Sequence, residues 1–85
     1  MYEWYFMWDK EEALLKFGSH VRKLRKSKGL SQDQVAANSK SLTKATISDI
    51  ENGKRNPEFT TILDLANGLN IPLTELVALE IEEAH

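Results

Sequence analysis

Residues 31–53, SQDQVAANSKSLTKATISDIENG, decide the fold. Ser31 followed three residues later by Gln34 is the capping-box pattern with which many helices begin. After a polar turn, Thr43 is a second helix start, and Gly53 is the kind of residue that ends a helix. The stretch therefore predicts two short helices joined by a tight turn, which is the arrangement of a helix-turn-helix.

The second of these helices has two different faces. Ile47 and Ile50 recur at helical spacing, which predicts that they anchor the helix to a core. The opposite face is small and polar, as a helix that enters the major groove of DNA requires. Its residues are Lys44, Ala45, Ser48, Asp49 and Asn52, and the basic loop of Lys54 and Arg55 follows them.

The flanking sequence predicts three further helices. The first begins at the cap Asp9 and ends at Gly29, with Gly18 inside it at a point of close packing. A helix starting at Thr60 or Thr61 ends at Asn70, and a last helix follows Pro72. No strand-rich region is present, so we expect an all-α, five-helix domain over residues 9–79, with an aromatic extension at 1–8 and a frayed tail at 80–85.

Composition excludes several classes of protein. The 85 residues suffice for one domain and include no cysteine, so thiolate metal sites and disulfides are ruled out. His20 and His85 lack partners at ligand spacing, and we expect no metal and no cofactor. No run approaches the roughly 18 apolar residues of a membrane span. A nucleophile–base pair, a carboxylate dyad and a phosphate loop are all missing, so we expect a protein that is not an enzyme. The lack of cysteine fits a reducing compartment, and we expect a cytoplasmic protein.

Charge is unevenly distributed along the chain. Residues 16–55 hold ten of the eleven Lys and Arg but only three of the thirteen Asp and Glu, which gives +7 there, −9 elsewhere and −2 in total. Such asymmetry favours a basic face that binds a polyanion. The alternative is a solvated helix face with ordinary charge scatter.

Three segments carry a family resemblance: FGSHVRKLRKSKGLSQDQVA, ISDIENGKRNP and TTILDLANGLNIPLTEL, which together fall within residues 17–76. In these segments the chain resembles the Cro/C1-type helix-turn-helix (XRE) regulators, the family that includes the lambdoid phage repressors. The resemblance implies a lambda-repressor-like five-helix domain. It also implies a homodimer that binds a palindromic operator in double-stranded DNA, with the third helix in the major groove.

The resemblance also assigns roles to residues. It implies that Gln32 contacts a phosphate, as a helix N-terminus would favour. Residues implied to read bases or line the groove are Thr43, Lys44, Ala45, Ser48 and Asp49, while Asn52, Lys54 and Arg55 would hold the DNA backbone. Lys44 could contact a guanine or a phosphate, and Asp49 could accept from cytosine, orient a basic side chain or be solvated. Arg25 and Glu51 match an ion pair that supports the third helix in the family. The anchors Ile47 and Ile50 support the same helix.

The turn departs from the family pattern. Val35 and Ile47 are twelve residues apart, one more than is usual, and the usual glycine is replaced by Lys40 or Ser41. We expect one of these residues, or Asn38, to take the left-handed conformation, at a cost of roughly 1 kcal/mol. The insertion leaves the angle of the third helix open.

The ends of the chain suggest contacts with other proteins. Residues of the last helix would form the dimer interface, namely Leu73, Leu76, Val77 and Leu79. Residues 2–8 are rich in aromatic side chains and would either cap the core or bind a partner. We interpret the chain as a transcriptional repressor. The alternatives are an antitoxin or a restriction–modification controller of the same fold, or a protein-interaction module that has lost operator binding.

Overall fold

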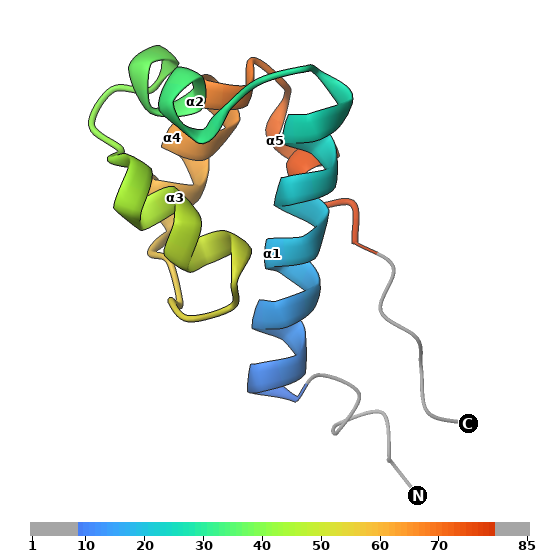
Figure 1. The fold of residues 1–85 in the computed structure, drawn as a ribbon. Helices are drawn as coiled ribbons and strands as arrows, with labels where there is room; N and C mark the ends of the chain where they lie inside the picture. The colour runs from blue at the N-terminus through green and yellow to red at the C-terminus, as the bar shows by residue number, and fades with distance from the viewer. Residues whose placement is uncertain (1–8, 80–85) are drawn as a thin grey trace, which may run out of the picture.

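The computed structural model describes residues 9–79 and contains five helices (Figure 1). They are α1 (Lys10–Ser27), α2 (Gln32–Asn38), α3 (Lys44–Glu51), α4 (Phe59–Leu69) and α5 (Leu73–Leu76). No strand occurs within 9–79, so the predicted all-α, five-helix fold is confirmed. The aromatic extension at 1–8 and the frayed tail at 80–85 were predicted for segments that lie outside the described residues.

Most helices begin and end where the sequence predicts. The side chains of Asp9, Ser31 and Thr43 each accept a hydrogen bond from the backbone N–H three residues on, at 3.0–3.1 Å. Gly29 (φ +68°) and Asn70 (φ +56°) are left-handed at the ends of α1 and α4. The predicted start of α4, at Thr60 or Thr61, is wrong by one or two residues, because the helix begins at Phe59.

α5 is much shorter than the sequence suggests. Its apolar residues recur as far as position 79, but the helix ends at Leu76 after four residues. Leu76 is fully buried, whereas Val77 is 48% exposed. A helix of this length is stabilised by the core that it packs on, since so short a helix is unstable alone.

The core draws on all five helices. Its buried apolar residues are Phe17, Val21, Val35, Ile47, Ile50, Leu65, Ala66, Leu69 and Leu76. α3 packs on α1 and α2, and α2 also packs on α4. α5 contacts both α4 and α1 (Figure 1). Gly18 lies where α1 meets α3, because a Cβ atom at this position would be 2.3 Å from the Ile50 carbonyl oxygen.

The turn between α2 and α3 does not follow the expected conformation. Asn70 is the single non-glycine residue with positive φ in the described part of the chain, so the prediction of a left-handed residue at Asn38, Lys40 or Ser41 is wrong. Instead the backbone N–H groups of Lys40 and Ser41 donate to the carboxylate of Asp64 on α4, at 2.7 and 2.8 Å. These bonds satisfy the backbone N–H groups of Lys40 and Ser41, and the turn contains no residue in the left-handed conformation.

Candidate nucleic-acid interface

The outer face of α3 carries the residues that the sequence predicts for DNA contact. Thr43, Lys44 and Ala45 are exposed at its N-terminal end, and Ser48 and Asp49 are half-buried further along. The inner face is closed off, since Ile47 and Ile50 are 0% and 1% exposed. The helix is therefore held by one side and presents small and polar groups on the other.

A loop follows the C-terminal end of α3 and leads to α4 (Figure 1). Lys54, Arg55 and Asn56 are all exposed. The loop starts from a defined backbone, because Lys54 N–H donates to the Asp49 carbonyl at 2.9 Å and Gly53 is left-handed at φ +71°. Asn52 ends the helix, and its side-chain amide donates to the Ser48 carbonyl at 2.9 Å. Two exposed basic residues thus follow α3 directly along the chain.

Lys44 has one carboxylate within reach. Its Nζ atom lies 3.7 Å from Oδ2 of Asp33 on α2, and the two side chains are 62% and 73% exposed. Exposed pairs of this kind contribute 1 kcal/mol or less, so Lys44 can leave Asp33 for a phosphate or a base. The sequence left Asp49 as a possible partner of Lys44, whereas the structure places Asp33 beside it.

Arg25 and Glu51 form the predicted link between α1 and α3. Arg25 Nε and Nη2 donate to the two carboxylate oxygens of Glu51 at 2.6 and 3.1 Å, and Nη1 donates to the Leu30 carbonyl at 2.8 Å. The hydrogen bond with Glu51 raises the pKa of Arg25 despite its burial. This bidentate pair fixes the C-terminal end of α3 to the longest helix.

Gln32 belongs to the same network. Its side-chain Nε2 donates to Glu51 Oε1 at 3.1 Å, and the residue is half-buried. The side-chain amide is therefore engaged with α3, which leaves the backbone N–H at the start of α2 as the group suited to a phosphate.

Asp64 is a site residue that the sequence did not single out. It is 8% exposed and accepts from Lys40 N–H, Ser41 N–H and the Ser41 hydroxyl. Burial disfavours its charge, but the hydrogen bonds from the Lys40 and Ser41 amides outweigh that cost and lower its pKa. A signal existed in the sequence, because this carboxylate lies between Leu63 and Leu65 and is the one charged residue of α4.

The lowered pKa predicts how stability depends on pH. The pKa of an Asp side chain in an unfolded chain is about 3.9. Because the pKa of Asp64 is lowered in the folded protein, the unfolded chain binds a proton at Asp64 more readily than the folded chain does. The contribution of Asp64 is therefore complete above that pH and is lost as the pH falls through the folded pKa. In urea titrations, the difference in midpoint between the wild type and Asp64→Asn should shrink between about pH 6 and pH 3. An equal difference at both pH values would contradict this assignment.

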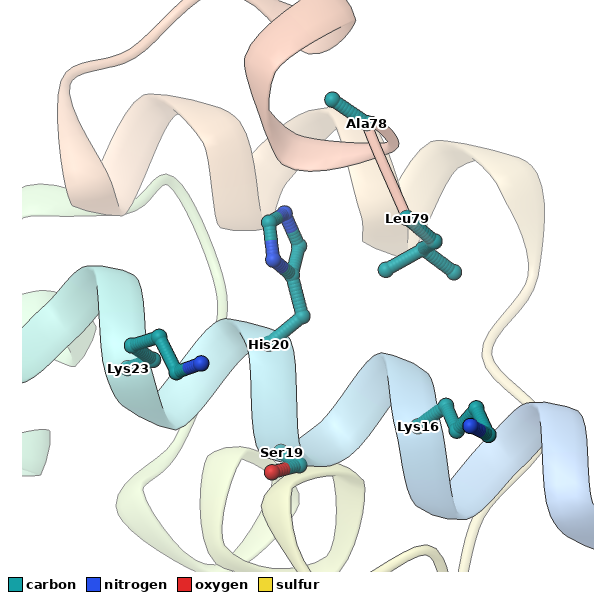
Figure 2. A pocket seen from close by; sticks show the side chains of 6 residues that line it. All are labelled: Lys16, Ser19, His20, Lys23, Ala78 and Leu79. Atoms are coloured by element: carbon teal, nitrogen blue, oxygen red, sulfur yellow. The ribbon is translucent and has the colours of Figure 1, made fainter. Parts of the chain in front are cut away.

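His20 links α1 to α5. Its Nε2 atom lies 3.1 Å from the Glu75 carbonyl oxygen. Figure 2 shows the ring pointing from α1 toward the segment that carries Ala78 and Leu79, beside a cavity of about 540 Å³ that Lys16, Ser19 and Lys23 also line. Within residues 9–79, no three His, Cys, Asp or Glu side chains gather as metal ligands would.

The predicted dimer residues have unequal access to a second chain. Leu76 is completely buried inside its own core, so its side chain has no surface to offer a partner. Val77 is exposed and Leu73 and Leu79 are half-buried, so these three could meet another copy. Among the described helices, none combines the length and apolar character needed to cross a membrane.

Comparison with known proteins agrees with this geometry. The family model described as Helix-turn-helix matches residues 21–76. An uncharacterised HTH-type transcriptional regulator of Sinorhizobium fredii, y4dJ, is 40% identical over 60 residues, which are 71% of this chain and 77% of that protein.

Two solved structures are also similar. The restriction–modification controller protein C.AhdI from Aeromonas hydrophila is 42% identical with a TM-score of 0.71, over 76% of this chain and 97% of that one. The C.Esp1396I controller, solved as a tetramer with its natural 35 base-pair operator, is 26% identical with a TM-score of 0.65, over 75% and 93% of the two chains. These relatives are described as regulators and controllers, as expected for a protein that is not an enzyme. The chain belongs to the Cro/C1-type helix-turn-helix family of transcriptional regulators.

Proposed function

We propose that this regulator binds double-stranded DNA in a sequence-specific way and acts as a repressor, as a homodimer on a palindromic operator. The observation that carries the proposal is the arrangement of α3. Its inner face is locked by Ile47, Ile50 and the bidentate Arg25–Glu51 pair, and its outer face ends in a basic loop. A rigid helix with a polar outer face suits the major groove, whose base edges offer donors and acceptors.

In this proposal the exposed residues divide by role. Lys44, Ala45 and Ser48 meet base edges, with Thr43 and Asp49 at the margins of the groove. Lys54 and Arg55 pair with phosphates, and so do Asn52 and the backbone N–H of Gln32. Phosphate contacts set register and affinity, whereas contacts at base edges set sequence preference.

The dimer would form through the segment that includes α5. Val77 is 48% exposed, and Leu73 and Leu79 border it. A two-fold dimer would place two copies of α3 on successive turns of DNA, which is why we expect a palindromic site.

One second candidate has an observation in its favour. C.AhdI, a restriction–modification controller, is 42% identical over 97% of its length, so this chain could control such an operon. Immunoprecipitation of bound DNA from cells distinguishes the roles. Recovery of a site upstream of a restriction endonuclease gene would favour the controller, and its absence would favour a repressor of other genes.

The central test is selection of duplexes from a random pool, followed by fluorescence anisotropy titration of the enriched sequence at several salt concentrations. We expect a palindrome, and log affinity that falls linearly with log salt by about 0.9 for each phosphate contact. Enrichment of no sequence, with weak binding common to all duplexes, would overturn the proposal.

Single substitutions separate base contacts from phosphate contacts. Lys44→Ala should cost about 1–3 kcal/mol on the enriched duplex and relax preference at one base position if Lys44 contacts a base. Arg55→Ala should weaken binding to all duplexes by a similar factor and reduce the salt slope by about 1. Lys10→Ala, on the far end of α1, is the matched control for loss of one charge. A Lys44→Ala profile identical to that of Arg55→Ala would assign Lys44 to a phosphate.

A further inference from the structure

In the turn that leads into α3, the backbone N–H groups of Lys40, Ser41 and Leu42 all donate to side chains. Lys40 N–H donates to Asp64 Oδ1 at 2.7 Å, Ser41 N–H donates to Oδ2 at 2.8 Å, and the Ser41 hydroxyl lies 3.3 Å from the same Oδ2. Leu42 N–H donates to the hydroxyl of Ser39 at 3.0 Å. Three successive amides of the turn are thus satisfied, two of them by one carboxylate from another helix.

The helix that carries Asp64 is itself firmly placed. α4 packs on α2 at Gly68, where a Cβ atom would be 2.6 Å from the Val35 carbonyl oxygen. Leu65 and Ala66 beside Asp64 are buried in the core. Asn67, one turn further on, donates a longer bond of 3.5 Å to Asp64 Oδ1. The carboxylate is therefore a fixed point to which the turn is tied.

α3 is consequently fixed at both ends by different helices. Its C-terminal end is tied to α1 through the 2.6 Å contact between Arg25 and Glu51. Its N-terminal end is linked to α4 through the turn, by the bonds of Lys40 and Ser41 to Asp64, and to α2 by the exposed Lys44–Asp33 pair at 3.7 Å. Lys44 stands three residues after Ser41. Movement of the turn would therefore displace Lys44 more than it displaces residues near Glu51.

We propose that Asp64 is a positioning residue that sets the N-terminal end of α3 against the base edges, and so determines sequence preference without contacting DNA. This inference rests on the proposed function. The carboxylate replaces a strained left-handed residue in the turn, and its two oxygens match two adjacent amides. Charge-assisted bonds of this kind are stronger than bonds between neutral groups, which suits a contact that has to hold a helix while it binds.

Asp64→Asn is the direct test, because the amide has nearly the same size but can accept on one side only. Its NH₂ group would face one of the two turn amides, and that amide would lose its bond. Asp9→Ala is the matched control. It removes the cap of α1, which also lowers stability, and lies outside the turn and α3.

The first measurement uses the free protein, so it does not depend on DNA. In nuclear magnetic resonance spectra of Asp64→Asn, the amide signals of Lys40 and Ser41 should move, and residual dipolar couplings should change over the first turn of α3 while those of α1 persist. In Asp9→Ala, the turn signals and the α3 couplings should stay as in the wild type. Unchanged couplings at the start of α3 in Asp64→Asn would overturn the positioning role.

The second measurement is affinity for the selected duplex and for an unrelated duplex, at a temperature where all variants are folded. Asp64→Asn should weaken the selected complex by about tenfold, comparable to loss of one base contact, and the unrelated complex by less than about twofold. Asp9→Ala should change neither. Equal losses on both duplexes would overturn the inference about specificity. If the wild type selects no sequence, the proposed function fails instead, and the couplings still decide whether Asp64 positions α3.

Discussion

Replacement of Gly18 by Ala is expected to lower the free energy of unfolding by about 3 kcal/mol, although alanine is the better helix former. The added Cβ would lie 2.3 Å from the Ile50 carbonyl oxygen and 2.6 Å from that of Glu51. Both oxygens belong to the backbone of α3, so no side-chain rotation can relieve the contact. The two helices would have to separate, and that would loosen the core between them.

Ser19→Ala is the control for this substitution. Ser19 is the next residue along α1 and is exposed, so its replacement tests helix propensity without the contact. Urea denaturation followed by circular dichroism should show a lower midpoint for Gly18→Ala and a midpoint near that of the wild type for Ser19→Ala. The free energy of unfolding of Ser19→Ala should lie within about 0.5 kcal/mol of the wild-type value. A raised midpoint for Gly18→Ala would mean that α1 and α3 are not in backbone contact.

Glu51→Ala is expected to cost about 3–4 kcal/mol, because it leaves a guanidinium without its carboxylate in a largely buried site. The side chains of Arg25 and Glu51 are only 11% and 3% exposed. The substitution also removes the acceptor of the Gln32 amide at 3.1 Å. Domains of this kind have a total stability of about 5–15 kcal/mol, so such a loss is a large share of the free energy of unfolding and should clearly lower the urea midpoint.

Two further variants test whether the stability lost in Glu51→Ala comes from leaving the Arg25 guanidinium without a carboxylate partner. Asp33→Asn removes the exposed Lys44 pair at 3.7 Å and should cost less than about 1 kcal/mol. The double variant Arg25→Met with Glu51→Leu should lose less free energy of unfolding than its two single variants lose in total, since apolar residues can replace a buried pair. Additive losses in this double-mutant cycle would argue against an interaction between the two side chains.

Local sequence patterns were sufficient to predict the caps at which three helices begin. Ser31, Thr43 and Asp9 were predicted as caps, and each accepts the hydrogen bond that a cap accepts. These predictions succeed because a cap and the N–H it satisfies are three residues apart, so both are visible in one short window. The end of α5 was missed because Val77 and Leu79 continue the apolar pattern, while exposure and the end of the helix depend on what surrounds them.

The turn shows where local reasoning ends. Nothing between Ser39 and Leu42 indicates that the partner of the turn is Asp64, more than twenty residues further along the chain. The expectation of a left-handed residue followed from the absence of glycine and was wrong. A carboxylate from another helix satisfied the amides instead, and a bond of that kind depends on how α4 packs against α2.

Caps, apolar spacing and charge distribution were enough to predict five helices, a basic segment and the face of α3 that points outward. The fold class follows from these patterns because each involves residues that are close in sequence, and the family was indicated by the resemblance of three segments to known regulators. The placement of α3 is a different matter. It depends on Gly18 against the Ile50 carbonyl, on Arg25 with Glu51 and on Asp64 with the turn. Each of these contacts joins residues more than twenty positions apart, and only the packed chain brings them within a few ångströms.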